Sequence, residues 1–438
     1  FNNNVSIRGF GSPLVIIDGV PRDGTQDLAQ LNSNDVESIS FLKDGSAAIY
    51  GMNSGNGVIL VTTKKGVSGK PVFSYQPILS TKAATGLEQT VDAYTYRVMK
   101  NEMDKNIGAS PTYAADVIEK FRTNQPGFTD NNWIDLTLHD RVFQQQHNLS
   151  VRGGTDRSRY FTSFGYAEDN GLLKSNVQKY RRYNFRATNS SNLTDNLRLN
   201  INFAGRLDNT NSPRDNFLWV LKPIMVTDRG VGPYTIGNPN HLTSPNQENT
   251  NPVAMMNPDL DGYRYQSDRQ FATTVDLNYD MPFLKGMKAT ILGAYDVNTR
   301  NESALRKAYD LYDYNTDARI LTFGNNQYSN FIENYTRIYV RGQLGYQTRI
   351  ADAHNISATG VAEMTRTRVD NVNAARQFTD LYTSDLINSG TPTTATNSGF
   401  RNFGALAGYV GKLNYDYKGK YFLEGMVRYD GTFRYAPN

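Results

Sequence analysis

The chain has 438 residues, a formal net charge of +4 and no cysteine. Its length predicts more than one folded unit, and its small net charge, without long charged blocks, argues against nucleic acid as a partner. The absence of cysteine excludes a disulfide framework, a thiolate metal site and a cysteine nucleophile. The 28 Tyr and 21 Phe, against 2 Trp, favour strands and suit a boundary between lipid and water.

The first 70 residues mix short apolar runs with Gly, Asp and Pro. Leu14–Ile17 is a continuous apolar strand that ends at the turn signal Asp18-Gly19. Asn34–Ile39 is predicted to form a capped helical turn, and Asp44–Gly51 a short helix stopped by glycine. Gly57–Thr63 is a second buried strand, so the segment predicts a small α+β unit.

From about Val72 onward, apolar and polar residues alternate with the period of a strand. Leu199 and Ile201, for example, alternate with Asn200 and Asn202, so we expect the first pair to face lipid and the second pair a lumen. The pattern predicts about 11 strands. A soluble antiparallel sandwich with one wet face explains the alternation as well.

The connections between these strands favour a transmembrane barrel. Short turns are predicted at Gly153–Arg157, Ser190–Asn196, Met281–Met287, Ala351–His354 and Tyr417–Gly419. Longer connections alternate with them, at Ser80–Gln144, Ala167–Lys179, Asp208–Gln266, Asn298–Asn330 and Val369–Ser398. Outer-membrane barrels have short periplasmic turns and long outer loops. The odd strand count predicts an open half-barrel with edges at Val72–Leu79 and Lys420–Tyr429, and hence an incomplete functional unit.

The long connections are expected to have structure and function of their own. Asp92–Lys105 and Pro111–Phe121 are predicted helices, and Asp208–Gln266 with Asn131–Asp135 is expected to form an outer vestibule or a contact with a lid. Polar and aromatic side chains there suit sugars or peptides. The candidate contacts are Trp133, Asp215, Trp219, Tyr234, Tyr263 and Tyr265.

No motif in the sequence predicts a catalytic, cofactor or metal site. The four histidines stand far apart, and Gly66–Pro71 fails the phosphate-loop pattern. Asp259–Gly262 resembles a fragment of a calcium loop but lacks the later ligands. We therefore expect no cofactor, no metal and no enzymatic activity.

Beside these patterns, the chain resembles the SusC-like TonB-dependent transporters of Bacteroidetes, also described as the SusC/RagA family. The plug of that family is matched in order by Ile7–Gly9, Ser12–Pro21, Asp35–Asp44, Ala47–Gly51 and Asn56–Gly66. Later matches are Asn132–Asp135, His147–Gly154, Leu413–Tyr421 and Arg434–Asn438. Two small departures from the family pattern are Gly45 and Met52–Gly55.

The resemblance implies a mostly β fold: a transmembrane antiparallel β-barrel, of which about half of 22 strands is present, with a small α+β plug at the N-terminus. Residues 1–70 would be the C-terminal part of the plug domain, and residues 71–438 the first half of the barrel with its long outer loops. The plug signature, with a structural or gating role, comprises Arg8, Gly9, Asp18, Gly19, Pro21, Lys43, Asp44, Tyr50, Gly51 and Gly57. Arg8 and Asp18 are expected to pair within the plug; the alternative is that they face ligand.

The same resemblance implies import of oligosaccharides or peptides across the bacterial outer membrane. The implied partners are a SusD-like surface lipoprotein acting as a lid, TonB, the transported substrate and outer-membrane lipid, with no nucleic acid; the TonB contact segment is expected outside this chain. Two other functions stay open at this point. One is an outer-membrane β-barrel enzyme, and the other is a soluble β-rich binding protein.

Overall fold

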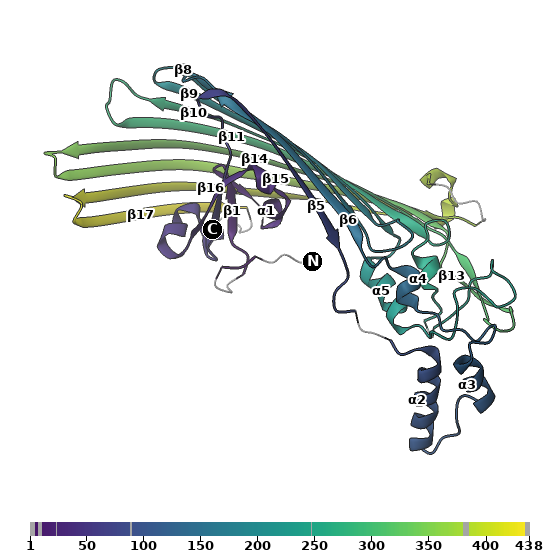
Figure 1. Ribbon diagram of the computed structural model, residues 1–438. Helices are drawn as coiled ribbons and strands as arrows, with labels where there is room; N and C mark the ends of the chain where they lie inside the picture. Colours follow the sequence, from purple (N-terminus) through teal and green to yellow (C-terminus); the bar gives the residue numbers. More distant parts are fainter. Residues whose placement is uncertain are drawn as a thin grey trace.

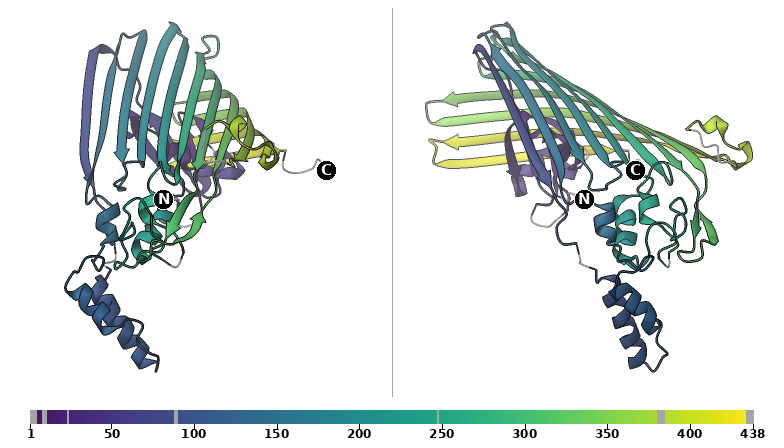
Figure 2. Two further views of the ribbon diagram at one scale, coloured as in Figure 1. Left: turned by 90° about the vertical axis from the view of Figure 1, so that its right-hand side faces the viewer. Right: turned by 45° about the vertical axis from the view of Figure 1, so that its right-hand side comes forward.

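The computed structural model describes residues 5–7, 11–22, 24–87, 90–246, 248–379 and 385–433. It contains a small mixed sheet, a very large antiparallel sheet and a group of short helices (Figure 1). The large sheet curves around the small one, and most of the helices gather beyond one end of its strands (Figures 1 and 2).

The small sheet has the strand order β2-β1-β4-β3. Its strands are β1 (Leu14–Ile17), β2 (Val20–Arg22), β3 (Val36–Leu42) and β4 (Val58–Thr63). The two predicted apolar strands, β1 and β4, are parallel central neighbours, and Val15 and Val58 in them are 0% exposed. Burial on both faces explains their continuous apolar sequences. We call this sheet with its helices, from Leu14 to Thr63, the plug unit.

Turns and short helices connect the plug unit. Asp18 and Gly19 join β1 to β2 with φ values of +49° and +82°, the two positive angles that a tight Asp-Gly hairpin turn needs. The helices are α1 (Gln26–Gln30), η1 (Ser33–Asp35), η2 (Asp44–Tyr50) and η3 (Met52–Ser54). The predicted helical turn at Asn34–Ile39 is correct only for η1, because Val36 already begins β3, where β-branched residues pair with β4.

The large sheet has 11 strands in the order β17-β16-β15-β14-β11-β10-β9-β8-β7-β6-β5, each antiparallel to its neighbours. Its strands are β5 (Gly69–Lys82), β6 (Val142–Gly154), β7 (Ser158–Asn170), β8 (Lys179–Thr194), β9 (Leu197–Pro213), β10 (Gly262–Asp280), β11 (Met287–Arg306), β14 (Gln327–Ile350), β15 (His354–Gln377), β16 (Thr396–Tyr417) and β17 (Tyr421–Thr432). The predicted open edges are confirmed, since β5 and β17 are the outermost strands. We call this sheet the wall.

The wall has two chemically different faces, as the alternation predicts. Asn200 and Asn202 lie on the concave face, where the Asn202 amide donates to the Asp18 carboxylate of the plug unit at 2.9 Å. Phe203 and Val275, of the opposite parity, are 41% and 41% exposed on the convex face. Leu199 shares that convex face, but it lies two residues from the start of β9 and so close to the rim of short turns.

The long connections at the other rim contain most of the helices. These are α2 (Ala93–Asn106), α3 (Ala115–Arg122), α4 (Trp133–Thr137), α5 (Phe217–Val226) and α6 (Pro252–Met255), with the hairpin β12 (Tyr309–Tyr312) and β13 (Arg319–Phe323) and the turns η4 (Ile387–Ser389) and η5 (Pro392–Thr394). The two predicted helices correspond to α2 and α3, which project from the rest as a pair (Figure 2). Within the described ranges, no helix is long and apolar enough to cross a bilayer.

Candidate functional site: the interface between plug unit and wall

A buried ion cluster joins the plug unit to strands β11 and β14. The Arg22 Nη1 atom of the plug unit lies 2.6 Å from Asp296 Oδ2, and Arg337 Nη2 lies 2.5 Å from the same oxygen. These three side chains are 8%, 3% and 2% exposed. Asp27 of α1 supplies a second carboxylate, 3.7 Å from Arg337 and 4.0 Å from Arg22. Two cations therefore face two anions, which offsets the desolvation cost of burying them.

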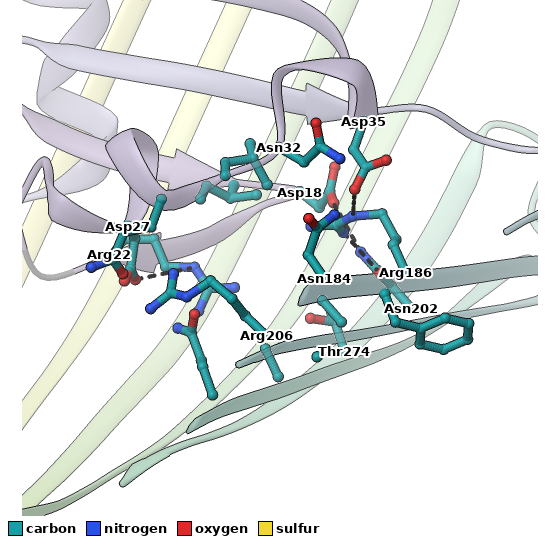
Figure 3. Close-up of a pocket in the computed structure, with 18 residues that line it drawn as sticks. Asp18, Arg22, Asp27, Asn32, Asp35, Asn184, Arg186, Asn202, Arg206 and Thr274 are labelled. Carbon is teal, nitrogen blue, oxygen red and sulfur yellow. Dashed lines mark hydrogen bonds and ion pairs between the residues drawn. The ribbon is translucent and has the colours of Figure 1, made fainter. Parts of the chain in front are cut away.

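A second cluster joins the turn after β1 to strands β7, β8 and β9 (Figure 3). Asp18 accepts from the Thr63 backbone N–H at 2.9 Å and from its hydroxyl at 2.7 Å, while Asn202 donates from the wall. Asp35 accepts from the Ser163 hydroxyl at 2.6 Å and from Arg186 Nε at 3.4 Å. Arg186 also lies 3.8 Å from Asp18, so one wall cation serves two plug carboxylates.

A third contact joins the end of η2 to the last strands. Arg428 Nη1 of β17 donates to the Ile49 carbonyl at 2.8 Å, and Nη2 of the same guanidinium donates to Glu363 at 2.7 Å. Gly51 has a φ of +87°, and a Cβ built on it would lie 2.8 Å from this guanidinium. Glycine is required here by both its backbone conformation and the close approach of Arg428.

Apolar contact between the two bodies is small by comparison. Val20 packs against Leu292, Ala294 and Tyr339 of the wall in one compact cluster. Around it the interface leaves cavities of about 80, 290 and 360 Å³, lined by plug and wall residues together. Polar and apolar groups both line these cavities, and their size is sufficient for water. The plug unit is therefore held mainly by ion pairs and hydrogen bonds.

The plug signature read from the sequence coincides only partly with this interface. Asp18, Gly19, Tyr50 and Gly51 lie against the wall, and Gly19 is next to the Arg341 guanidinium. Pro21 belongs to β2, Gly57 directly precedes β4, Lys43 is exposed, and Asp44 begins η2. Arg8 and Gly9 lie outside the described residues, so the expected pairing of Arg8 with Asp18 stays a prediction.

Sequence reasoning missed the charged residues that form the contacts. These are Arg22, Asp27 and Asp35 on the plug unit and Arg186, Asp296, Arg337 and Arg428 on the wall. A signal existed for the wall members, because each occupies the lumen parity of an alternating strand. Nothing in the sequence assigned them to particular partners.

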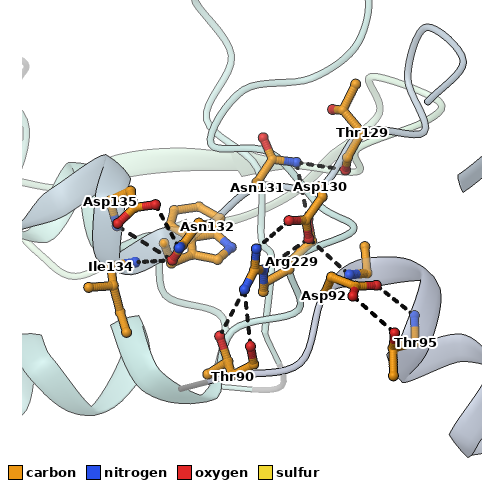
Figure 4. A network of polar contacts seen from close by, with 12 residues as sticks. Thr90, Asp92, Thr95, Thr129, Asp130, Asn131, Asn132, Ile134, Asp135 and Arg229 are labelled. Carbon is orange, nitrogen blue, oxygen red and sulfur yellow. Dashed lines mark hydrogen bonds and ion pairs between the residues drawn. The ribbon is translucent and has the colours of Figure 1, made fainter. Parts of the chain in front are cut away.

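The outer connections form a second polar assembly. Arg229 donates from Nε to Asp130 at 2.9 Å and from Nη1 to the Thr90 carbonyl at 3.1 Å (Figure 4). Asp130 also accepts from the backbone N–H of Ala93, which fixes the start of α2. Arg97 of α2 is buried and pairs with Asp228 at 3.1 Å. The projecting helix pair is thus tied to the loop between β9 and β10.

The six predicted ligand contacts fall into three environments. Trp133 is 1% exposed, packs in a local core and donates from its indole N–H to the Asp228 carbonyl at 3.1 Å. Tyr263 and Tyr265 share the convex parity of β10 with Val275. Trp219 and Tyr234 are 61% and 38% exposed in the outer connections, and Asp215 pairs with Arg214 at 2.5 Å.

One buried carboxylate stands out among the outer connections. Asp261 is 0% exposed, and Arg214 Nη1 lies 3.2 Å from its Oδ1 atom. Burial raises the pKa of Asp261 to about 7, although the nearby Arg214 opposes that shift. Within the described ranges, no group of three or more His, Asp or Glu side chains is arranged to hold a metal ion.

A small mixed sheet, held by polar contacts against the concave face of a wide antiparallel sheet, defines the class of plugged outer-membrane β-barrels. Residues 1–58 match the family model described as the TonB-dependent Receptor Plug Domain. The chain is 28% identical to TonB-dependent receptor P26 of Formosa agariphila, over 98% of this chain and 41% of that protein. It is 26% identical to TonB-dependent receptor SusC of Bacteroides thetaiotaomicron, over 99% of this chain and 43% of that protein.

Solved structures agree on the fold. The RagAB peptide importer in its open-open state matches with a TM-score of 0.78 at 18% identity, over 99% of this chain and 50% of that one. The ferric citrate transporter FecA matches with a TM-score of 0.57 at 11% identity, over 98% and 49%. The chain is therefore similar to TonB-dependent receptors, SusC among them, and it spans about two fifths of the length of the curated relatives it matches.

Proposed function

We propose that this chain supplies the plug and the first half of the barrel of an importer for oligosaccharides or peptides, driven by TonB and capped by a SusD-like surface lipoprotein. We propose residues 1–70 as plug domain and residues 71–438 as barrel. The curated relatives are named as TonB-dependent receptors, and the structural neighbour RagAB is described as a peptide importer. These relatives favour transport over an outer-membrane enzyme or a soluble binding protein.

The observation that carries the proposal is the polar, incompletely filled interface between plug unit and wall. The three contact groups described above close the concave face, and cavities remain between them. Ion pairs and hydrogen bonds can exchange with water when two surfaces separate, so such an interface can open without exposing a large apolar area. A plug that must be released for each substrate needs this property.

A disulfide that locks the plug unit to the wall tests the proposal, in a receptor that has the full length of its relatives. Ser163 of β7 and Asp35 of the plug unit are in side-chain contact, and this chain has no cysteine of its own. We expect Ser163→Cys with Asp35→Cys to abolish uptake of labelled oligosaccharide and peptide pools under oxidising conditions. Reductant should restore uptake. Unchanged uptake with a fully formed disulfide would refute release of the plug.

The matched control joins two strands of the wall. The hydroxyls of Ser158 and Ser191, in β7 and β8, are 3.0 Å apart. A disulfide between cysteines at these positions links residues that already pair in the sheet. We expect uptake to be the same under oxidising and reducing conditions in this variant.

We further propose that the loop between β9 and β10, with residues 131–135, forms the outer vestibule or the contact with the lid. Asp215, Trp219 and Tyr234 are the ligand-contact candidates that we retain in it. Substituting all three by alanine should lower uptake while the receptor still folds, because α5 is anchored through Val220 and Ile224, which are 0% and 1% exposed. Normal uptake and normal co-purification of the lipoprotein with this variant would refute the proposed role of the loop.

A further inference from the structure

Three arginines on the convex face of β15 and β16 form a positively charged patch. Arg366 and Arg368 follow Met364 on the convex parity of β15, and Arg401 lies on the same face of β16. The parity is set by Glu363, which lies on the concave face and holds Arg428, and by Met364, which is 48% exposed. We call Arg366, Arg368 and Arg401 the arginine patch.

The arginine patch is not neutralised by its neighbours. Asp370 accepts from Nε of both Arg368 and Arg401, and Arg366 has no ion pair within the described residues. One carboxylate therefore serves two guanidinium groups, and the patch as a whole carries three positive charges against this one negative charge. Arg368 and Arg401 remain 47% and 59% exposed, so donors that Asp370 does not occupy face outward.

The height of the patch on the wall identifies its surroundings. β15 begins at His354 next to a short turn, whereas its far end at Gln377 leads into a long connection. Strand residues rise about 3.4 Å each, and a tilt of about 40° leaves roughly 2.6 Å per residue along the bilayer normal. An apolar band of about 25 Å is then crossed in roughly ten residues. Arg366, the twelfth residue after His354, therefore lies at the outer boundary of that band.

The residues below the patch agree with this placement. The convex positions between His354 and Arg366 are Ile356, Ala358, Gly360, Ala362 and Met364, with no charge among them. On β16, Phe403 lies opposite Arg368 in the register, and the guanidinium carbon of Arg368 is 5.8 Å from the centre of its ring. Aromatic side chains are typical of the interface between lipid and water. The apolar surface thus ends where the positive charge begins.

We infer that the arginine patch binds the phosphate groups of lipids in the outer leaflet. Guanidinium groups bind phosphate with paired, charge-assisted hydrogen bonds, and a patch at headgroup height on a lipid-facing surface meets such groups directly. Asp370 bridges Arg368 and Arg401, which keeps the two guanidinium groups close together for a shared phosphate oxygen. The inference rests on the outer-membrane location and not on the transported substrate.

The test uses a receptor that has the full length of its relatives and is purified in detergent. Lipid A is titrated into it, and binding is measured by native mass spectrometry. We expect lipid A with its phosphates to bind about tenfold more tightly than the same lipid after phosphatase treatment. Arg366→Gln with Arg368→Gln and Arg401→Gln should remove this preference, and the three lysine substitutions should retain part of it. Equal preference in the glutamine variant and the wild type would overturn the inference.

Two controls separate the patch from general effects of charge and folding. Arg319 and Arg349 are 55% and 61% exposed and each pairs with one aspartate, but they lie in an outer hairpin and beside a short turn. Glutamine at these two positions should leave the preference for phosphorylated lipid A unchanged. Millimolar inorganic phosphate should not displace the lipid; complete displacement would assign the patch to free phosphate and overturn the lipid assignment. Heat-modified migration in gels verifies that every variant is folded.

Discussion

Arg22 of the plug unit and Asp296 of β11 form a buried ion pair of 2.6 Å, although 274 positions of sequence separate them. Arg337 shares the same carboxylate oxygen, so Asp296 holds two cations, one from each body. Removal of the Asp296 carboxylate would leave both guanidinium groups buried beside the more distant Asp27, at 4.0 Å from Arg22 and 3.7 Å from Arg337. Substitution of Asp296 is therefore a specific way to weaken the contact between the plug unit and the wall.

We expect Asp296→Asn to weaken the seating of the plug by about 3–5 kcal/mol, the usual cost of breaking a buried ion pair from one side. Hydrogen exchange of residues 14–22 in the full-length receptor measures this, as does ion conductance in planar bilayers. Asp352→Asn is the control, because Asp352 is 100% exposed in its pair with Arg349. Equal exchange in the two variants would contradict the role of Asp296.

The convex face should tolerate charge according to depth in the bilayer. Phe203 lies six residues from the start of β9, whereas Leu199 lies only two from it. We expect Phe203→Arg to cost about 2–4 kcal/mol and Leu199→Arg about 0–1 kcal/mol, because the penalty falls toward the interface. Leu199 thus faces lipid, as the sequence predicts, and its position near the start of β9 places it close to the interface. Folding of the full-length barrel into lipid vesicles under a urea gradient gives both values, and a larger loss at Leu199 would reverse the depth assignment.

Glycine at position 57 should be required by its backbone. Its φ is +91°, and a Cβ there would lie 2.8 Å from Ile7 Cδ1 and 3.2 Å from the Leu42 carbonyl oxygen. We expect Gly57→Ala to destabilise the plug unit by at least about 1–2 kcal/mol. Gly205→Ala is the control, since a Cβ at that position has no heavy atom within 4 Å and its φ is not positive. Hydrogen exchange of residues 58–63 distinguishes the two variants.

The outer connections should be more stable at mildly acidic pH than above pH 7. The pKa of Asp261 is raised to about 7, so the folded state binds a proton that the unfolded state has already released above about pH 4. The resulting stability is complete below the unfolded pKa and is lost as pH rises through about 7. Protection of residues 251–261 from hydrogen exchange, corrected for intrinsic rates, should fall by at most about tenfold per pH unit, the limit for one proton.

Asp261→Asn tests that assignment. The amide cannot titrate, so protection of the same residues should lose its dependence on pH between about 4 and 7. Arg214, Asp215, Arg306 and Tyr309 are the other ionisable groups that act on Asp261. A pH dependence that persists in the Asn variant would assign the proton to a different group.

The sequence predicted the strands better than the connections, for a physical reason. Within the bilayer each strand alternates lipid-facing and lumen-facing residues, so the count, the parity and the open edges were all predicted correctly. Beyond the bilayer both faces meet water and the alternation fades. The predicted loops Asp208–Gln266 and Asn298–Asn330 therefore began too early, since β9 continues to Pro213 and β11 to Arg306. The hairpin β12–β13 was missed for the same reason.

Site residues were predictable where a turn or a resemblance marked them, as at Asp18, Gly19 and Gly51. The partners of charged residues could not be predicted. The alternation of a strand assigns Arg186 or Asp296 to one face of the wall, but it gives no information about which plug residue lies opposite. Trp133 shows that the environment of a single aromatic residue in a loop could not be predicted either. An aromatic residue in a polar loop suits a ligand or a local core equally well, and only its 1% exposure and its bond to the Asp228 carbonyl decide for the core.

The distribution of contacts around the plug unit also has a mechanical consequence. Arg22 meets β11, Asp18 and Asp35 meet β7 to β9, and Ile49 meets β17, so the attachment points are spread along the wall. A force applied to one side of the plug unit loads the nearest attachment first, and water from the adjoining cavities can replace each broken bond before the next one carries the load. The bonds then break one after another, so the peak force depends on the strongest single attachment and not on the sum of all attachments.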